Sequence, residues 1–344
     1  MNFNIEPIST QIEEALQQKI DTKTKPQGSL GKLETIALKI GKIQDTLSPA
    51  LNKPAILVCA ADHGITQEGI SPFPQEVTFQ MVMNFLGGGA AINVFTQQNN
   101  IELVLADTGV NFDFEKHPSL LDYKIAKGTK NFASEAAMTI AQCEQAMQNG
   151  AAITEKLHAN GTNIIGFGEM GIGNTTAAAA LLTAYTNIDA KDAAGAGTGL
   201  DEKGIAHKAE VIAKAIAKQG IPNSPLEILA TYGGFEIATI CGAMLKAAEL
   251  KMIVMVDGFI VTAAFLAASK INVTIADYAL FCHKSNEKGH ALMLDHLNAE
   301  PILDLGMRLG EGTGNAVAYP VIKSAVQFLN NMSSFADAGV ATEK

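Results

Sequence analysis

The sequence predicts an α/β protein with an open, mostly parallel sheet and helices on both faces. Three observations support this fold class. Apolar runs of strand length alternate with Ala-rich helical stretches, and turns that contain glycine join them. Those runs are apolar throughout, which is typical of parallel strands covered on both faces. The chain has 344 residues, 47% of them hydrophobic, so it is long enough to bury a large core.

Six apolar segments are interpreted as strands that alternate with helices, which is the pattern of a doubly wound sheet. In each segment, polar residues or glycines follow the apolar run, so the turns fall at the strand ends. The segments are AILVCAADHG (55–64), IELVLADTG (101–109), TNIIGFGEMGIGNTT (162–176), LEILATYGGFE (226–236), KMIVMVDGF (251–259) and DYALFCHKS (277–285).

Both ends of the chain are predicted to be helical. Between residues 30 and 47, apolar residues recur at steps of three and four, and Ser29 is the candidate N-cap after a Pro-Gln-Gly turn. The stretch after residue 315 is again helical in pattern, with a kink or break near Pro320. We expect residues 1–50 and 315–344 to form a small helical domain, and residues 51–314 to form a large α/β domain.

Composition and charge exclude several classes of protein. The net charge of −10 argues against a general nucleic-acid surface, which needs a basic face. The four cysteines form no CxxC pair, as expected of reduced thiols in the cytoplasm. The N-terminus lacks the pattern of a signal peptide. The most apolar stretch, residues 252–268, is interrupted by Asp257-Gly258, so no membrane span is expected.

Polar side chains stand where the predicted strands end. In open parallel sheets, ligands bind beyond the carboxyl ends of the strands. Any one of these residues is as consistent with a helix cap as with a functional role, but together they would line one crevice. They are Asp62-His63, Asp107, Glu169, Tyr232, Asp257 and His283.

Two glycine-rich loops are candidates for binding a phosphate. GEMGIGNTT (168–176) leads into an Ala-rich helix, whose N-terminus would offer free N–H groups; the alternative is a plain strand-to-helix turn. The segment is neither a P-loop nor a GxGxxG dinucleotide fingerprint. The second loop is GAGTGLDEKG (195–204), and Lys208 on the following helix could reach a phosphate or be a solvated lysine.

A third glycine-rich stretch, LGMRLGEGTGNA (305–316), places Glu311 between two glycines with Arg308 nearby. As a pattern, this carboxylate can be catalytic or can cap the next helix. The seven histidines are dispersed, and neither HExxH nor GxSxG occurs, so we expect no metal site and no serine-hydrolase site.

Taken together, the motifs resemble nicotinate-nucleotide–dimethylbenzimidazole phosphoribosyltransferases over roughly residues 20 to 330. Asn315 departs from the small alanine usual in that family, which we expect to alter packing and not chemistry. The motifs are KPQGSLGKLE (25–34), AADHGI (60–65), PQEVTFQMV (74–82), GEMGIGNTT (168–176), GTGLDEKGIAHK (197–208), VDGFIV (256–261), HKSNEKGH (283–290) and LGMRLGEGTG (305–314).

The resemblance implies a reaction that needs no cofactor and no metal. Ribose 5-phosphate would pass from nicotinate mononucleotide to a benzimidazole-type base, with inversion at C1′. The leaving pyridine ring is already cationic, so one carboxylate that removes the N–H proton of the attacking base meets the main need. The family assigns that role to the position of Glu311. The resemblance also implies a Rossmann-like domain with a small helical domain, in a homodimer whose active sites are partly closed by the neighbouring subunit.

The resemblance assigns further roles by position. Glu169 would be a second active-site carboxylate, near the ribose. Arg308 is interpreted as orienting its loop through a carboxylate or carbonyl partner. A binding protein that keeps the fold without turnover is the competing hypothesis, and a dinucleotide-dependent oxidoreductase is a weaker one. The pocket for the aromatic base would contain Pro72, Phe73, Gln80 and Leu309, and the nucleotide would lie against Gly171, Gly173, Asn174, Gly197 and Lys208.

Overall fold

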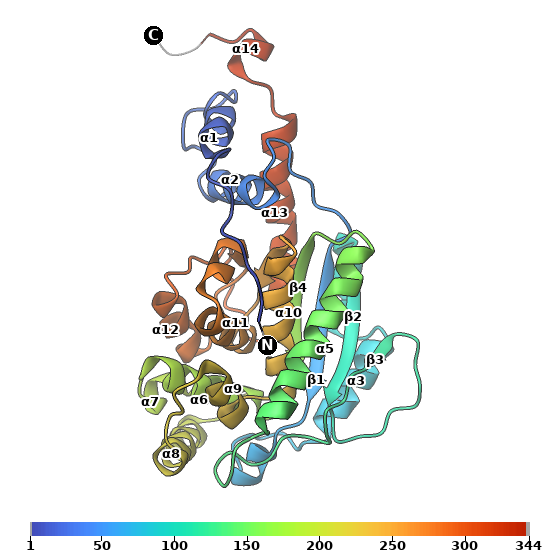
Figure 1. Cartoon of the computed structure of the whole chain (residues 1–344), viewed down its shortest axis with the longest axis vertical. Coiled ribbons are helices and arrows are strands. Elements are labelled where there is room, and N and C mark those ends of the chain that lie inside the picture. Colours follow the sequence, from blue (N-terminus) through green and yellow to red (C-terminus); the bar gives the residue numbers. More distant parts are fainter. Residues whose placement is uncertain (1, 342–344) are drawn as a thin grey trace.

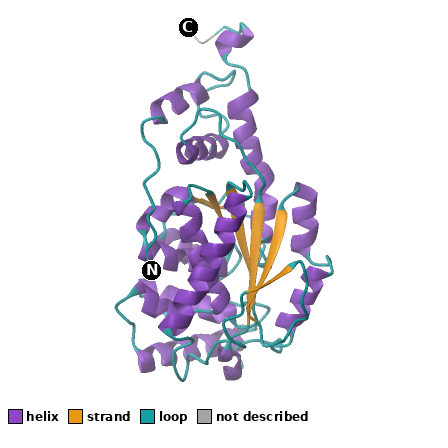
Figure 2. Cartoon of the chain, turned by 45° about the vertical axis from the view of Figure 1, so that its right-hand side comes forward, coloured by secondary structure: helices purple, strands orange, loops and turns teal. Residues whose placement is uncertain are grey.

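A six-stranded parallel sheet organises the computed structural model, which describes residues 2–341 (Figures 1 and 2). The strand order is β3-β2-β1-β4-β5-β6, and every neighbouring pair is parallel. The order reverses between β1 and β4, the position where open α/β sheets bind ligands. The strands are β1 (Ala55–Ala61), β2 (Glu102–Gly109), β3 (Leu120–Asp122), β4 (Ile164–Met170), β5 (Ile253–Val256) and β6 (Ala279–Phe281).

Helices connect the strands and cover both faces of the sheet. They are α1 (Glu13–Asp21), α2 (Lys32–Gln44), α3 (Val77–Leu86), α4 (Ala91–Asn99), α5 (Ile140–Ala159), α6 (Asn174–Thr186), α7 (Ala190–Ala193), α8 (Glu202–Gln219), α9 (Pro225–Tyr232), α10 (Phe235–Glu249), α11 (Phe259–Ile271), α12 (Lys288–His296), α13 (Thr313–Asn331) and α14 (Phe335–Ala338), with short 3₁₀ helices η1 (Gly64–Glu68) and η2 (Val273–Tyr278).

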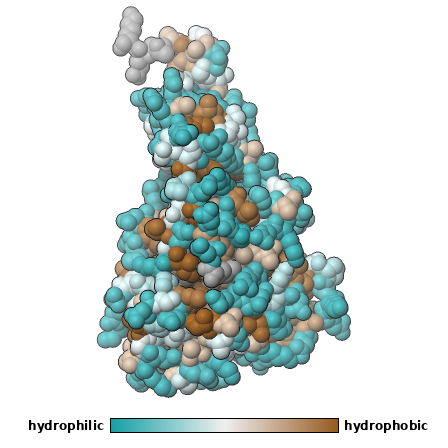
Figure 3. Space-filling model, viewed as in Figure 1, coloured by the Kyte–Doolittle hydropathy of each residue, from teal (hydrophilic) through white to brown (hydrophobic). Residues whose placement is uncertain are grey.

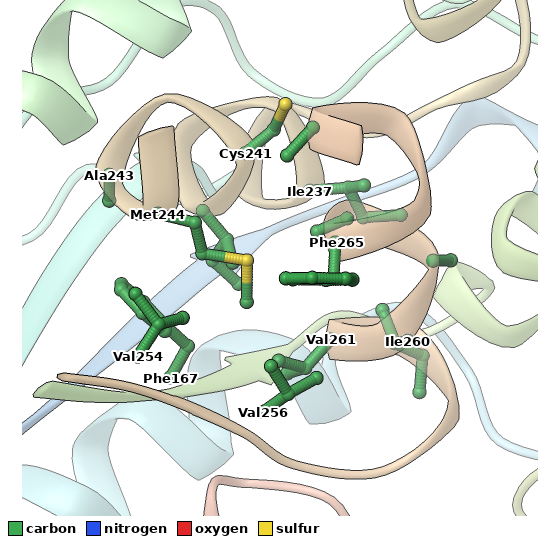
Figure 4. Close-up of a cluster of buried hydrophobic side chains, with 14 of the residues drawn as sticks. Phe167, Ile237, Cys241, Ala243, Met244, Val254, Val256, Ile260, Val261 and Phe265 are labelled. Atoms are coloured by element: carbon green, nitrogen blue, oxygen red, sulfur yellow. The ribbon is translucent and has the colours of Figure 1, made fainter. Parts of the chain in front are cut away.

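Strand β4 shows how the two faces of the sheet differ. Phe167 points into the core formed with α10 and α11, where Met244 and Phe265 lie (Figure 4). Gly166 and Gly168 alternate with it and face the start of α13, so closely that a Cβ on Gly168 would clash with the Glu311 carbonyl. The glycines of β4 therefore let the Glu311 loop lie directly on the sheet.

The prediction of a strand at residues 226–236 is wrong, because this segment contains α9 and the start of α10. Pro225 occupies the first turn of α9, where proline is pre-organised for a helix and no N–H is lost. Tyr232 therefore ends a helix, and its buried hydroxyl donates to the Gly220 carbonyl at 2.5 Å. The sixth strand is instead β3, a three-residue edge strand whose apolar run is too short to stand out in the sequence.

The first predicted terminal helix begins later than expected. Helix α2 starts at Lys32 with Gly31 at the N-cap position (φ +53°), so Ser29 is not its cap. Glu34 replaces it: its carboxylate accepts the Leu30 N–H at 2.9 Å and pairs with the Lys25 ammonium at 2.9 Å. A side chain inside the helix thus caps the preceding turn.

The chain does not break at Pro320, because α13 runs as one helix from Thr313 to Asn331, and a kink at this proline stays a prediction. A proline removes the N–H that would bond to the carbonyl four residues earlier, here that of Ala316. The Asn99 side chain of α4 donates to this carbonyl at 3.0 Å. A partner from another helix thus satisfies the acceptor that Pro320 leaves free.

The two ends of the chain pack against each other, with α1 and α2 beside α13 in the upper part of Figure 1. Lys23 forms a bridge with Ser334, and its Nζ donates to the Met332 carbonyl at 2.5 Å. The N–H of Phe335 donates to the Thr22 carbonyl at 3.0 Å. The division into residues 1–50 with 315–344 and residues 51–314 stays a prediction, and α13 begins two residues before its boundary.

On the face seen in Figure 3, apolar residues occur in small groups between hydrophilic ones. Within residues 2–341, the helices are either too short or too polar to cross a membrane. All four cysteines are buried and carry free thiols. The apolar residues 252–268 form β5 and α11, and β5 is fully buried in the sheet.

Candidate active site

A cavity of about 610 Å³ opens beyond the carboxyl ends of β4, β5 and β6. Glu169 near the end of β4, Asp257 after β5 and His283 after β6 all line it. The loops that carry Gly197 and Glu311 complete its wall. The crevice expected at this edge of the sheet is therefore present, and its polar lining comes from separate parts of the chain.

Not every strand-end residue contributes to this cavity. Asp107 pairs with the Lys124 ammonium at 2.6 Å, and Asp62 accepts the Asn111 N–H at 2.7 Å. His63 is buried under the cavity wall, and Tyr232 belongs to α9. For these four, the prediction of one shared crevice is wrong: they hold loops or helices in place instead.

Glu311 adopts an unusual backbone conformation that its flanking glycines make possible. Its φ is +63°, in the left-handed region that side chains other than glycine seldom adopt. Gly310 and Gly312 on either side both have φ +85°. A Cβ on Gly310 would clash with the Glu169 carboxylate. The loop therefore winds tightly over β4 and brings the Glu311 and Glu169 residues together.

The Glu311 carboxylate is buried and only partly satisfied. Burial raises its pKa above the ordinary value, the backbone N–H of Ile92 opposes the rise, and the Asp257 charge adds to it. Oε2 has no hydrogen-bond partner among the described residues. A carboxylate with a raised pKa and a free oxygen is a stronger base than a solvated one. Glu311 can therefore accept a proton from a bound ligand.

Glu169 is buried to the same extent as Glu311. Its carboxylate accepts a hydrogen bond from the Asn174 side chain. Burial raises its pKa well above the ordinary value, the charges of Glu236 and Asp257 add to the rise, and the hydrogen bond from Asn174 lowers it in part. A positive charge placed in the cavity would favour the ionised form of Glu169.

The GEMGIGNTT segment forms a tight turn into helix α6. Gly173, at the N-cap position, has φ +100°, and α6 begins at Asn174. The N–H of Ile172 donates to the buried Thr78 hydroxyl at 3.1 Å. A Cβ on Gly171 would clash with the Ala61 carbonyl. The turn is thus fixed from below while the first turn of α6 lies beside the cavity.

Lys208 is not a solvated lysine, because only 1% of it is exposed. Its ammonium donates to the Thr175 hydroxyl at 3.1 Å and to the Gly195 carbonyl at 3.3 Å. Burial lowers its pKa to about 8, although the nearby Glu287 charge opposes this. A Cβ on Gly197 would lie 3.1 Å from Nζ. The ammonium therefore lies directly behind the cavity wall that Thr175 and Gly197 form.

Arg308 joins the third glycine-rich stretch to the second one. Its guanidinium donates to the Gly197 carbonyl at 3.0 Å, and both residues line the cavity. The sequence predicts that Arg308 orients its loop through a carboxylate or carbonyl partner, and the Gly197 carbonyl is such a partner. The contact ties the Glu311 loop to the loop in front of Lys208.

The predicted pocket for an aromatic base is present only in part. Phe73 and Leu309 line the cavity and remain 48% and 58% exposed. Pro72 and Gln80 are exposed and do not line it. Val77 and Met81 of α3 line this wall, and sequence reasoning missed both. Phe73 precedes α3, whereas Val77 and Met81 lie four residues apart on one face of this helix, and that helical spacing was the available signal.

An Asp257–His283 pair stands behind Glu311, and sequence reasoning gave it no specific role. Asp257 Oδ1 lies 2.9 Å from His283 Nδ1, and both residues are 1% exposed. Burial opposes protonation of His283, but the hydrogen bond and charge of Asp257 outweigh it and raise its pKa. A Cβ on Gly314 would clash with both side chains. Gly314 therefore lets the start of α13 lie against this pair.

No group of three or more His, Cys, Asp or Glu side chains within residues 2–341 is placed to hold a metal ion. His290 is buried, accepts the Ser285 N–H at 2.8 Å and lies 3.0 Å from the Thr262 hydroxyl. Burial lowers its pKa to about 3. It therefore acts as a neutral hydrogen-bonding group that fixes the Ser285–Glu287 loop at the cavity.

Comparison with known proteins identifies the family of the chain. A family model described as "Phosphoribosyltransferase" matches residues 5–340. The nicotinate-nucleotide–dimethylbenzimidazole phosphoribosyltransferase of Dechloromonas aromatica is 52% identical, over 100% of this chain and 99% of its own; that of Parabacteroides distasonis is 47% identical, over 99% of each. The crystal structure of CobT from Thermus thermophilus superposes with a TM-score of 0.94 at 40% identity, covering 96% of this chain and 99% of its own. The chain therefore belongs to the nicotinate-nucleotide–dimethylbenzimidazole phosphoribosyltransferase family and is a transferase.

Proposed function

We propose that the chain transfers ribose 5-phosphate from nicotinate mononucleotide to 5,6-dimethylbenzimidazole or a similar base, forming an α-ribotide and nicotinate. The observation that carries this proposal is the pairing of two features across one cavity. A buried carboxylate with a free oxygen, Glu311, stands on one side. On the other, the glycine turn at Gly171–Gly173 and the loop in front of the buried Lys208 offer N–H groups and a positive charge.

The phosphate of the nucleotide would lie against the N-terminus of α6 and the wall in front of Lys208. The N–H groups there and the helix dipole favour an anion. Among the described residues, no carboxylate lies within salt-bridge distance of the buried Lys208 ammonium, whose partners are a hydroxyl and a carbonyl. A bound phosphate would provide the missing negative charge. Binding would then draw a proton onto Lys208, whose pKa of about 8 leaves part of the population neutral near that pH.

The chemical step needs one base and no acid. A benzimidazole nitrogen attacks C1′, and the C1′–N bond to the pyridinium breaks, so the bond electrons neutralise the leaving ring. The new ribotide would carry a positive charge unless its N–H proton leaves. Glu311 Oε2 takes that proton, and its raised pKa matches this role. Attack opposite the leaving group inverts C1′ from β to α.

Glu169 supports this step by electrostatics. Its carboxylate lies at the cavity between the phosphate side and the Glu311 side, held by Asn174. The cationic pyridinium ring of a bound nucleotide would lower its pKa and favour the ionised form. A carboxylate there stabilises the positive charge that develops on the ribose as the C1′–N bond breaks.

Product analysis tests the proposal. The protein is incubated with nicotinate mononucleotide and dimethylbenzimidazole, and released nicotinate and the ribotide are separated by chromatography. We expect both products in equal amounts, with the α configuration at C1′ by NMR. A protein that binds both compounds but releases no nicotinate would be a binding protein, and the proposed transfer would be rejected.

A further inference from the structure

His63 and Glu236 form a buried hydrogen-bonded pair that the chemical step does not use. His63 Nε2 lies 2.6 Å from Glu236 Oε1, and the two residues are 1% and 0% exposed. Neither residue lines the cavity. Burying two ionisable groups costs desolvation energy that their attraction often fails to offset, so such a pair is a weak device for stability alone. A role linked to the neighbouring cavity would account for it.

The His63 ring fills the space beneath the Gly171–Gly173 turn. A Cβ on Gly171 would lie 3.3 Å from the ring carbon Cδ2, and a Cβ on Gly173 would lie 3.2 Å from the Cβ of His63. On the opposite side, a Cβ on Gly234 would clash with the ring carbon Cε1 and lie 2.8 Å from Nε2. The ring is therefore enclosed between the turn at the end of β4 and the start of α10.

Glu236 fixes the orientation of this ring. It belongs to the first turn of α10, where the helix dipole favours a carboxylate. Its Oε1 contacts Nε2, the ring atom beside Gly234, and so holds the ring in the orientation that places the neighbouring atom Cδ2 toward Gly171. The backbone of His63 is held as well, because its carbonyl accepts the Thr66 hydroxyl at 2.8 Å.

The turn above the ring has other supports as well: a Cβ on Gly171 would clash with the Ala61 carbonyl, and a Cβ on Gly173 would lie 3.0 Å from Thr66 Cγ2. The N–H of Ile172 donates to Thr78, and the N–H of Asn174 donates back to the Gly171 carbonyl at 3.1 Å. Ile172, between the two glycines, is buried, but Gly171 and Gly173 themselves have no side chains with which to pack. A loss of volume beneath it would let Gly171 and Gly173 sink, and their N–H groups would then turn away from the cavity.

We propose that His63, oriented by Glu236, is a positioning residue that holds the Gly171–Gly173 turn in the geometry that binds the phosphoribosyl part of the nucleotide. This inference rests on the proposed function for the identity of the nucleotide. The side chains of the pair lie on the nucleotide side of the cavity. On the Phe73–Met81 side, where the aromatic base would bind, the Gln75 side chain reaches His63 at its backbone carbonyl, at 3.4 Å.

The test compares His63→Ala with His63→Gln. Alanine removes the support beneath the turn, so the Kd and KM for nicotinate mononucleotide should rise about tenfold, while the KM for the benzimidazole changes less than about twofold. Glutamine keeps an N–H near the position of Nε2 and refills part of the volume, so it should recover at least half of the loss. Glu236→Gln retains an acceptor for Nε2 and should have a smaller effect than Glu236→Leu, which removes it.

A matched control separates positioning from general loosening of the fold. Thr154→Ala removes buried hydrogen bonds to the Gly150 and Ala243 carbonyls between α5 and α10, without touching the turn. It should lower the melting temperature but leave the Kd for the nucleotide unchanged. If Thr154→Ala weakens nucleotide binding as much as His63→Ala does, the effect is general and the positioning role is wrong.

Direct binding by calorimetry keeps this inference separate from the proposed reaction. Wild-type protein that binds nicotinate mononucleotide but releases no nicotinate would overturn the reaction, while the ratio of Kd values would still decide the role of His63. Equal Kd values for His63→Ala and wild type would overturn the role of His63 even if the reaction proceeds. If His63→Ala does not fold, His63→Gln and Glu236→Leu are compared in the same way, and unchanged Kd values in both would overturn it.

Discussion

At the scale of single residues, burial decides the chemistry of the cavity. The ordinary pKa of a glutamate lies far below neutrality, and a solvated lysine is fully charged. Burial shifts Glu169 and Glu311 upward and Lys208 downward, so all three move toward the neutral form in the free protein. Bound charges of opposite sign would reverse these shifts, and the site is therefore matched to a ligand that carries both a cationic ring and an anionic phosphate.

Glu311→Gln tests the proposed base. The amide keeps the shape of the side chain but cannot accept the proton, so kcat should fall by a factor on the order of 10² or more. In wild type, kcat/KM should fall at acidic pH with a midpoint above 4.5, because burial raises the pKa of Glu311 in the free protein. Full activity of Glu311→Gln, with melting temperature unchanged, would show that another group is the base.

Glu169→Gln tests the electrostatics of the second carboxylate through stability. A folded-state pKa above the unfolded value means that the folded protein holds its proton more tightly, so stability is lost as pH rises above 4.5. Glutamine removes this loss and still accepts the hydrogen bond from Asn174. The melting temperature of the variant minus that of wild type should therefore increase from pH 4 to pH 8, and a flat difference would contradict the pKa shift.

Lys208→Met has the opposite pH dependence. The folded-state pKa of Lys208 is lowered to about 8, so wild type loses stability as pH falls from 10.5 through 8. Below pH 8, methionine should raise the free energy of unfolding by up to about 3 kcal/mol. The loss of the two hydrogen bonds of Lys208 reduces this gain, and the gain should vanish as the pH approaches 10.5. Denaturant melts across this range measure it. The same variant should bind nicotinate mononucleotide more weakly.

At the scale of elements, glycines decide which elements can touch. Helices α5 and α10 cross with their backbones nearly in contact: a Cβ on Gly150 would clash with the Thr239 carbonyl, and one on Gly242 would clash with Met147. In the same way, the absence of a side chain at Gly168 lets the Glu311 loop lie in contact with β4. These glycines are required for packing, whereas the glycines flanking Glu311 are required for backbone conformation.

Gly150→Ala should destabilise the protein by roughly 2 kcal/mol or more, although alanine is the better helix former, because the helix axes must separate. Gly87→Ala is the control: its φ is −75°, and the nearest heavy atom to an added Cβ is an ordinary 3.4 Å away. It should change the free energy of unfolding little. Denaturant melts that rank the two variants equally would show that α5 and α10 adjust freely.

At the scale of the whole molecule, the cavity is open on the side where apolar residues are exposed. Phe73 and Leu309 line its mouth, and Leu305, on the same loop as Leu309, is 57% exposed. Exposed apolar side chains around a site are typical of a surface that a partner covers. The family resemblance implies a homodimer, and we propose that a second copy of the chain covers this opening of the cavity.

Sedimentation measures the assembly directly. We expect a particle of twice the chain mass of 36.2 kDa, and Leu305→Asp should shift it toward the monomer by placing a charge in the interface. Val273→Asp, at a residue that is 76% exposed and does not line the cavity, is the matched control and should leave the mass unchanged. Wild type that sediments as a monomer at micromolar concentration would contradict the homodimer.

The sequence by itself determined the fold class, five of the six strands and the family. Apolar runs and glycine turns are local signals, because each strand must be apolar and each tight turn must free its backbone whatever lies around it. Because these signals are local, they fail where distant parts of the chain decide the structure. Residues 226–232 are apolar enough for a strand, but the proline at the start of α9 and the packing around it favour a helix. Pro320 fits inside a helix only because Asn99 bonds to the carbonyl of Ala316.

Only the tertiary structure decided how the candidate residues meet. It brought together Glu169, Glu311 and the Asp257–His283 pair from distant segments, and it placed Val77 and Met81, not Gln80, on the cavity wall. The sequence left open whether Lys208 is solvated, and the structure shows that it is buried, with a pKa lowered to about 8. Charge, burial and pKa depend on neighbours far away in the chain. For that reason the sequence can identify the candidate reacting groups, but the packing of the sheet, the loops and α13 determines their pKa values.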